Sequence, residues 1–158
     1  MPLRSPYLLF SMSLPHTAQP RLQEGALGFI SQDKVNDSYL STSGCVGYQF
    51  PEAQHIPGRG PIPNCDLVRL VAYQVSTKRL YLPHVRGIEG SFYAISPSSI
   101  RINGIPRGDF GIHFDANVPG SAGCIVIRNP SDWERFKKEM SDLNEKGIQQ
   151  IDLLVKYA

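Results

Sequence analysis

The sequence predicts a mainly β fold with one α-helix near the C-terminus. The 158 residues are enough for one domain with its own core, since 41% of them are hydrophobic. The 14 glycines and 13 prolines divide the chain into short segments, which is typical of strands joined by turns rather than of a helical bundle. Only residues 131–147 combine helical spacing with signals for a helix start and a helix end.

The expected strands are short and follow one another along the chain. Residues 7–14 are apolar enough for a strand or an ordered arm, and residues 21–43 have the pattern of a hairpin with its turn at 31–34. Short apolar runs predict further strands at 67–75, 80–82, 92–95, 100–105, 125–127 and 148–155. Residues 45–66 are rich in Pro and Gly and are expected to form a long irregular loop, which in a compact domain is usually functional or well packed.

The predicted helix begins at Ser131, a residue type that caps helix N-termini, and Glu134 three positions later completes a capping box. Gly147 stands where a C-cap is expected. Four large apolar residues recur at helical spacing between these ends, and we expect them to pack in the core. They are Trp133, Phe136, Met140 and Leu143.

Composition and charge narrow the functional classes. The net charge of +2 predicts no strongly basic surface for nucleic acid. No apolar run is long enough for a transmembrane helix. The run 7–14, preceded by the single Arg4, is too weak for a convincing signal peptide. Residues 1–20 are therefore interpreted as an N-terminal arm or extra strand, and residues 21–158 as the main domain.

The three cysteines leave at least one thiol without a partner in the chain, because their number is odd. Cys45 and Cys65 could form a disulfide if the protein works outside the cytosol. The chain has no CxxC spacing, and His113 with Asp115 lacks an evident third ligand nearby. Neither a zinc ribbon nor another metal site is therefore expected.

The segment GIHFDANVPGSAGCI, residues 111–125, places His113 and Cys124 at the two ends of a loop rich in Gly and Pro. A thiolate is a strong nucleophile, and a neighbouring imidazole can take the thiol proton. Acyl transfer also needs donors for the oxyanion, which the N–H groups of Gly123 and Cys124 could supply. Ser121 could brace the turn or add a hydroxyl donor. This segment is therefore a candidate nucleophile loop.

The same residues also fit structural roles. Cys124 precedes the apolar residues 125–127, and Cys is among the most buried residue types, so it could be a core residue that enters a strand. His113 could be a hydrogen-bonded structural residue, and a redox-sensor role for Cys124 is a third interpretation. Residue types alone leave these alternatives open.

Three residues are candidates for substrate binding. Arg128 follows the cysteine by four positions, which keeps both on one face of a strand, where Arg128 could bind a substrate carboxylate through two hydrogen bonds. A surface Arg at a strand end is an equal alternative. Tyr48, in the long loop, could form a groove wall, and Asp115 is a candidate beside the loop, with a solvated turn position as its alternative. Arg107 is a weaker candidate for the same carboxylate as Arg128, and a surface position is the preferred expectation for it.

The segment IHFDANVPGSAGCIVI, residues 112–127, resembles the signature of the L,D-transpeptidase (YkuD-like) catalytic domain, in which a His precedes a loop, then Ser/Thr-x-Gly-Cys and an apolar strand. Two weaker matches come earlier in the expected order, STSG at 41–44 and GPIP at 60–63. The resemblance spans about residues 21–128. It implies a β-sandwich or barrel with one C-terminal helix.

The resemblance implies a role for each matched residue. Cys124 matches the nucleophile, which forms a thioester with a stem-peptide acyl group, and His113 matches the base. Gly123, with the Cys124 N–H, matches the oxyanion donors. Ser121 matches the Ser/Thr of the motif.

Two residues depart from the pattern of the family. Many members have His where this chain has Ala122, and many have a small polar residue, which helps to orient the catalytic His, where this chain has Phe114. A backbone carbonyl is the first expectation for the group that orients His113, and Asp115 is the second.

The resemblance further implies a bacterial or phage enzyme that modifies peptidoglycan at the cell wall or in the periplasm and needs no metal or cofactor. It would act on tetrapeptide stems as an L,D-transpeptidase, an L,D-carboxypeptidase or both, and a carbapenem would acylate Cys124. The GPIP and AGCIVI segments together resemble a compact branch that includes wall-damaging effectors and lysins. A catalytically idle wall-binding or virion structural domain of the same fold is the alternative.

Overall fold

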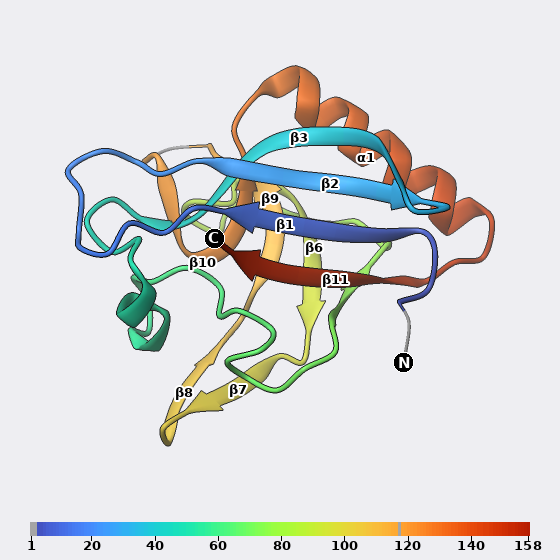
Figure 1. The fold of residues 1–158 in the computed structure, drawn as a ribbon. Coiled ribbons are helices and arrows are strands. Elements are labelled where there is room, and N and C mark those ends of the chain that lie inside the picture. The colour runs from blue at the N-terminus through green and yellow to red at the C-terminus, as the bar shows by residue number, and fades with distance from the viewer. Residues whose placement is uncertain (1–2, 117) are drawn as a thin grey trace.

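A curved sheet of nine strands dominates the computed structural model, which describes residues 3–116 and 118–158 (Figure 1). The strands are β1 (Tyr7–Met12), β2 (Gly25–Ser31), β3 (Lys34–Cys45), β4 (Tyr73–Ser76), β5 (Leu80–Leu82), β6 (Gly90–Ser96), β9 (Gly111–Phe114), β10 (Gly120–Ile127) and β11 (Gln150–Tyr157). They follow the order β4-β11-β1-β2-β3-β10-β9-β6-β5 in the sheet. Two neighbouring pairs, β1 with β11 and β9 with β10, are parallel.

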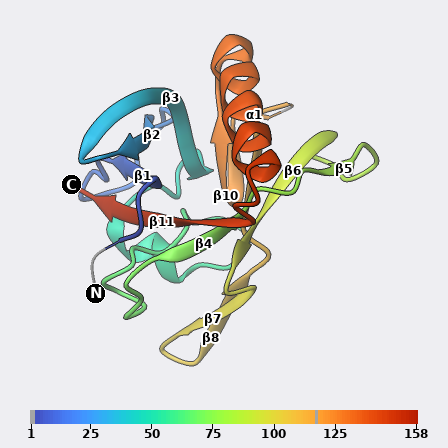
Figure 2. The ribbon, with the colours of Figure 1, turned by 90° about the vertical axis from the view of Figure 1, so that its right-hand side faces the viewer.

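The sheet closes on itself because β4 pairs with two strands. Besides β11, it pairs with β6, where Gln74 lies opposite Ser96 and Val75 opposite Ile95. The strands therefore curl around a shared apolar core in a barrel-like arrangement. A second, two-stranded sheet, β7 (Ser99–Ile102) with β8 (Ile105–Gly108), projects from the body, as Figure 2 shows. The prediction of a mainly β fold of sandwich or barrel type is confirmed at this level.

Strand β1 is part of the main sheet, between β11 and β2. Its side chains alternate in exposure, and Leu8 and Phe10 are fully buried. Residues 1–2 of the predicted N-terminal arm lie outside the described residues. The first strand thus supplies core residues to the same sheet as the rest of the chain.

The hairpin of β2 and β3 lies where the sequence predicts it. Gln32 and Asp33 form its two-residue turn, both with positive φ, 53° and 61°. Such a turn matches the right-handed twist of the flanking strands. Strand β3 then continues to the STSG residues at 41–44, which it brings beside β10.

Two strand predictions need correction. Of residues 67–75 only 73–75 belong to a strand, β4, because the preceding residues turn and expose Leu67 and Val71, which are 41% and 64% accessible. Residues 100–105 form the end of β7, a turn at Asn103–Gly104 and the start of β8, instead of one strand. Asn-Gly between apolar residues is a strong hairpin signal that explains this turn.

The helix α1 spans Pro130–Glu145 and starts one residue before the predicted cap. Asn129 is the N-cap residue and makes no side-chain cap hydrogen bond, so the capping box predicted at Ser131 is wrong. Pro130 explains the earlier start, because its fixed φ suits the first turn of a helix. The predicted C-terminal end is confirmed by Gly147, which has a φ of 86° just after the C-cap Lys146.

Helix α1 covers one side of the sheet with the four apolar residues that the sequence predicts to be buried. The ring centroid of Phe136 lies 5.4 Å from that of Tyr39, 5.3 Å from that of Tyr93 and 5.8 Å from that of Trp133. Among the described helices, none combines the length and the apolar content that crossing a bilayer requires.

Phe136→Ala should lower the free energy of unfolding by about 3–5 kcal/mol, because it removes a fully buried ring that contacts three other aromatic rings. Urea denaturation followed by circular dichroism measures this loss. Lys138→Ala, on the exposed face of the same helix, is the matched control and should change the value by no more than about 0.5 kcal/mol. Similar small losses in both variants would contradict the packing of α1 on the sheet.

Candidate functional site

The two parallel strands β9 and β10 bring His113 and Cys124 together. His113 lies on β9 opposite Val126 of β10, and Ile112 lies opposite Ile125. One step further along this register, Cys124 lies beside Gly111, which shares its strand face with His113. Parallel neighbours need a crossover connection, and here the chain from Asp115 to Cys124 makes it. The sheet register therefore fixes the relative positions of the imidazole and the thiol.

His113 is 5% exposed and is held by two contacts. Its Nδ1 lies 2.8 Å from the carbonyl oxygen of Phe114, the kind of partner that the sequence favoured. A carbonyl only accepts, so Nδ1 carries the proton and Nε2 of the neutral ring is free to accept one. The ring of Phe92, opposite His113 on β6, stacks on the imidazole at 6.0 Å.

Burial lowers the pKa of His113, although the Phe114 carbonyl and the negative charge of Asp115 act in the opposite direction. The ring is therefore neutral at pH 7, which is the form that a general base needs. The imidazole of His113 binds a proton more readily in the unfolded chain than in the folded protein. The contribution of His113 to stability is therefore lost as the pH falls below 6.5, the ordinary pKa of histidine.

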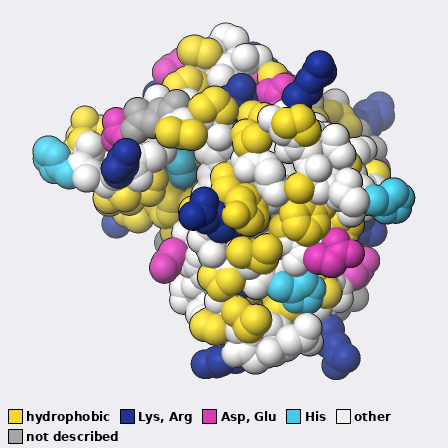
Figure 3. All heavy atoms as spheres, turned by 90° about the vertical axis from the view of Figure 1, so that its left-hand side faces the viewer, with side chains coloured by type: hydrophobic (Ala, Val, Ile, Leu, Met, Phe, Trp, Pro, Cys, Tyr) yellow, Lys and Arg dark blue, Asp and Glu magenta, His cyan; other side chains and the backbone are white. Residues whose placement is uncertain are grey.

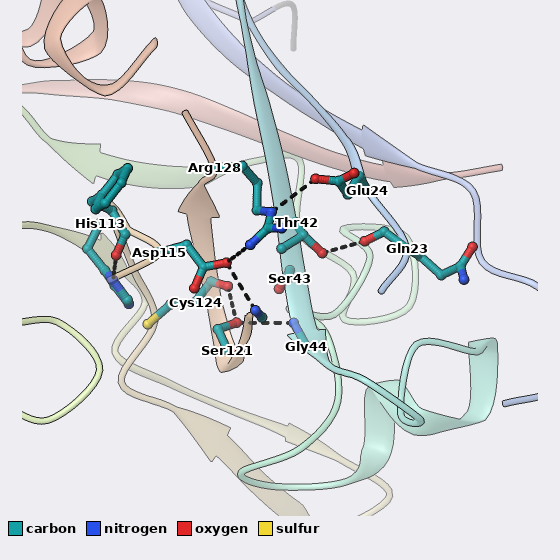
Figure 4. Close-up of polar contacts among 12 residues, drawn as sticks. Gln23, Glu24, Thr42, Ser43, Gly44, His113, Asp115, Ser121, Cys124 and Arg128 are labelled. Carbon is teal, nitrogen blue, oxygen red and sulfur yellow. Dashed lines mark hydrogen bonds and ion pairs between the residues drawn. The ribbon is translucent and has the colours of Figure 1, made fainter. Parts of the chain in front are cut away.

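The thiol of Cys124 is protonated at rest. Its Sγ donates to the carbonyl oxygen of Asp109 at 3.7 Å, and burial raises its pKa to about 11. Figure 4 shows the sulfur on the side of the site that faces the imidazole of His113. The pair is thus a neutral thiol beside a neutral imidazole, so proton transfer must accompany attack on a substrate.

Ser121 braces the turn before Cys124. Its Oγ donates to the Cys124 carbonyl oxygen at 2.5 Å and accepts from the N–H of Gly44 at 3.1 Å (Figure 4). It also accepts from the N–H of Gly123 at 3.2 Å. This is the bracing role that the sequence suggested for the residue. The Gly123 N–H is consequently bound to Ser121, and it can serve an oxyanion only by exchanging that hydrogen bond for one to substrate.

Ser43 of β3 fixes the same turn from the other side. Its Oγ donates to the carbonyl oxygen of Gly123 at 2.9 Å and accepts from the N–H of Ile62 at 2.8 Å. Gly44, which follows it, has a φ of 87°, and a Cβ there would lie 2.8 Å from the nitrogen of Pro61. The STSG and GPIP segments therefore meet directly behind the candidate nucleophile loop.

Arg107 links three segments around the site and is 3% exposed, so the surface position expected for it is wrong. Its Nη1 donates to the carbonyl oxygens of Gln54 at 3.1 Å and Pro61 at 2.7 Å. Its Nη2 donates to those of Gly60 at 3.1 Å and Ala122 at 3.3 Å. Nothing in the spacing of the sequence indicates this contact, because its acceptors are all backbone groups.

The glycine before the cysteine is required by this packing. Gly123 has a φ of 140°, and a Cβ at its position would lie 2.7 Å from Nη2 of Arg107 and 3.0 Å from the ring of Phe110. A larger residue would push the guanidinium from its carbonyl partners. This steric limit gives a physical reason for Gly at this place in the motif.

Asp115 and Arg128 bind each other instead of lining a cavity with Cys124. Arg128 Nη1 lies 2.6 Å from Asp115 Oδ2, and its Nε lies 3.0 Å from Glu24 Oε2 (Figure 4). The Asp115 side chain is 3% exposed and also accepts from the N–H of Gly120 at 3.1 Å. The pair closes the base of the crossover, which includes Asn117, a residue outside the described part. A substrate carboxylate would have to displace Asp115 to reach Arg128.

Cys124 lies between two cavities. The first, here called the histidine-side cavity, has a volume of about 410 Å³ and is lined by His113, Cys124, Cys45, Arg59 and Arg86 among others. The second, the aspartate-side cavity, has a volume of about 490 Å³. Its lining includes Asp109, Arg107 and Gly123 together with the same Cys124. Cys124 therefore borders both cavities.

Tyr48 does not line the histidine-side cavity but lies beneath one of its walls, with the guanidinium of Arg59 5.4 Å from its ring centroid. A cavity of about 790 Å³ lies elsewhere, between the N-terminal segment and β11, and its lining contains no His or Cys. We place the candidate site at Cys124 because a thiol and an imidazole line one cavity there.

The described residues 3–116 and 118–158 contain three free cysteines, so the open question of a Cys45–Cys65 disulfide is answered against it in this structure. Within the same residues, no group of three or more His, Cys, Asp or Glu side chains is placed to hold a metal ion.

Comparison with known proteins finds no matching family model, no matching curated protein and no matching solved structure.

Ser43→Ala should lower the free energy of unfolding by about 1–3 kcal/mol, because it leaves the buried Gly123 carbonyl and Ile62 N–H without their hydroxyl partner. Ser41→Ala is the matched control on the same strand. The Ser41 hydroxyl is buried and has no hydrogen-bond partner among the described residues, so its removal should be neutral or stabilising. Chemical denaturation measures both variants, and equal losses would contradict the bracing role of Ser43.

Alkylation of Cys124 by iodoacetamide should be slow at pH 7 and rise about tenfold per pH unit up to pH 9, because only the thiolate reacts and burial raises the thiol pKa to about 11. Mass spectrometry of the peptide that contains Cys124 measures the rate separately from the other cysteines. A rate that levels off below pH 8 would indicate a resting thiolate–imidazolium pair and contradict the neutral pair described above.

Proposed function

We propose that this chain is a peptidoglycan-modifying cysteine acyl-transfer enzyme of the L,D-transpeptidase type, which acts on tetrapeptide stems through a thioester at Cys124. The observation that carries the proposal is the pairing of Cys124 with a neutral His113 whose Nδ1 proton is fixed by the Phe114 carbonyl, both in one cavity. The motif resemblance in residues 112–127 supplies the reaction class.

In the proposed acylation step, the thiol proton of Cys124 passes to Nε2 of His113 while Sγ attacks the substrate carbonyl carbon. The new S–C bond forms a tetrahedral oxyanion, and the peptide C–N bond then breaks as the imidazolium returns the proton to the leaving amine. In deacylation, an acceptor amine or water gives a proton to Nε2 and attacks the thioester. The thiolate leaves and regains the proton from His113.

The loop around Gly123 supports stabilisation of the oxyanion. The N–H of Gly123 is bound to Ser121 Oγ at 3.2 Å, longer than the usual hydrogen bonds to an anion, so a developing negative charge would compete for it. Ser43 and Arg107 hold the carbonyl groups on either side, at Gly123 and Ala122. The turn is therefore kept in place while one donor changes its partner.

The second cavity at Cys124 supports a two-substrate reaction. A donor peptide bound on the histidine side would leave the aspartate side open for the acyl acceptor. An amine there would give a cross-link or an exchange product, and water would give L,D-carboxypeptidase activity. We further propose that the protein acts at the bacterial cell wall, as a wall-modifying enzyme, a wall-damaging effector or a lysin.

A second candidate function is a catalytically idle wall-binding or virion structural domain. One observation favours it, because the Cys124 thiol is held by the Asp109 carbonyl and its raised pKa makes it a poor nucleophile at rest. The acyl-transfer proposal requires the S–H bond of Cys124 to turn from the Asp109 carbonyl toward Nε2 of His113 when substrate binds.

Incubation of the protein with purified muropeptides should produce new stems that lack the terminal D-amino acid or carry an exchanged or cross-linked acceptor, as measured by mass spectrometry. Cys124→Ala should abolish these products, and His113→Ala should lower the acylation rate by about 10²–10⁴-fold, since it removes the general base. A carbapenem should add its mass to Cys124 in the unaltered protein.

The melting temperature of both variants is the control, and it should stay near that of the unaltered chain. Muropeptide binding without any product or adduct would favour the idle domain. Product that persists in Cys124→Ala would exclude a thioester at this residue.

A further inference from the structure

The histidine-side cavity has a positively charged rim. Its lining contains two arginines, Arg59 and Arg86, and no Asp or Glu. The ion pairs among the described residues involve neither of them. Both side chains are exposed, so a negatively charged ligand could reach them. The cavity therefore combines a nucleophile, a base and two available cations.

Arg59 is held in place by its backbone and by its side chain. Its carbonyl oxygen accepts from the N–H of Cys45 at 2.9 Å and from the Cys45 thiol at 3.3 Å, which ties it to the end of β3. Its guanidinium lies over the ring of Tyr48, 5.4 Å from the centroid. Stacking on an aromatic ring orders a guanidinium and leaves its edge available for hydrogen bonds.

Arg86 reaches the cavity from a separate segment, the loop between β5 and β6. Turn hydrogen bonds from Ile88 and Glu89 to the Val85 carbonyl, at 3.1 and 2.9 Å, order this loop, and the Glu89 carboxylate accepts from the N–H of Gly87 at 3.1 Å. The loop stands out from the body in Figure 2. In Figure 3, seen from the opposite side, the surface between this projection and the body is hollowed.

The two cavities at Cys124 differ in charge. On the aspartate side, Arg107 already donates to four carbonyl oxygens, and Asp109 adds a carboxylate to the lining. On the histidine side, only the two arginines are charged when His113 is neutral. An anionic group of a substrate is therefore favoured on the histidine side and disfavoured on the aspartate side.

We propose that Arg59 and Arg86 bind the C-terminal carboxylate of the acyl-donor peptide and so orient the residue that leaves. This inference rests on the proposed function, in which a stem tetrapeptide ends one residue beyond the scissile carbonyl. At about 410 Å³ the cavity lies toward the small end of the range of ligand pockets, roughly 300–1,000 Å³. A cavity of this size suits one short residue and its carboxylate better than a longer peptide.

The test compares the binding of the tetrapeptide L-Ala-γ-D-Glu-L-Lys-D-Ala with that of its C-terminal amide, measured by calorimetry on the Cys124→Ala protein, which leaves both peptides intact. The acid should bind about tenfold more tightly than the amide, the effect expected for a charge-assisted hydrogen bond. The difference should shrink at high salt, because the arginines are exposed.

In the Arg59→Gln, Arg86→Gln double variant of the same protein, the acid and the amide should bind alike. Arg101→Gln is the matched control, because Arg101 is exposed on the β7–β8 hairpin and lines neither cavity. It should keep the preference for the acid. An unchanged preference in the double variant, or equal binding of acid and amide before substitution, overturns the proposal.

A thioester assay on the protein with Cys124 intact separates this inference from the proposed function. Preference for the acid that depends on the arginines, without any acyl adduct or released D-alanine, supports the carboxylate site and contradicts the acyl-transfer enzyme. An adduct that forms equally fast from acid and amide supports the enzyme and contradicts the carboxylate site.

Discussion

The hydrogen bonds of the Arg107 guanidinium to four backbone carbonyls are the interaction on which the geometry of the candidate site most depends. The guanidinium binds the carbonyl oxygens of Gln54, Gly60, Pro61 and Ala122 and so joins the 3₁₀-helix at Pro51–His55, the following loop and the turn before Cys124. Hydrogen bonds from a charged donor are worth about 1.5–3 kcal/mol each, more than neutral ones. A buried cation that lacks a carboxylate among its described partners is stabilised here by carbonyl dipoles, and in return it ties these irregular segments to one another.

Two hydroxyl groups complete the support that Arg107 begins. Ser43 holds the Gly123 carbonyl, and Ser121 holds the Cys124 carbonyl together with two backbone N–H groups. The turn therefore has few conformations available before a ligand arrives, and a site ordered in advance spends less of its binding energy on ordering itself. The thiol is less firmly held than the turn around it, since its hydrogen bond to the Asp109 carbonyl is long, at 3.7 Å.

The predictable features are those that depend on local pattern. The β2–β3 hairpin, the buried face of α1 and the His113–Cys124 segment follow from apolar spacing, turn residues and a motif in sequence order. The apolar run 67–75 misled the strand prediction because its exposed residues turn before β4. Arg107 acts through backbone acceptors distant in sequence, and Phe92 acts through a ring contact with His113 across two strands. Such contacts leave no signal in composition or spacing. The sequence likewise gives no indication that Arg128 and Asp115 form an ion pair, because each residue taken alone also fits an exposed position.

The parallel pairing of β9 and β10 has a consequence for how such a protein can diversify. Strand register sets the spacing of thiol and imidazole, and the Asp115–Gly120 hydrogen bond closes the base of the crossover, so the exposed Val118 and Pro119 are not among the contacts described above that position His113 and Cys124. Val118 and Pro119 from this stretch nevertheless line the histidine-side cavity. Substitutions at Val118 and Pro119 would change the shape offered to a ligand while leaving His113 and Cys124 in place, so these two positions are where new specificities can be selected at the least cost to the fold.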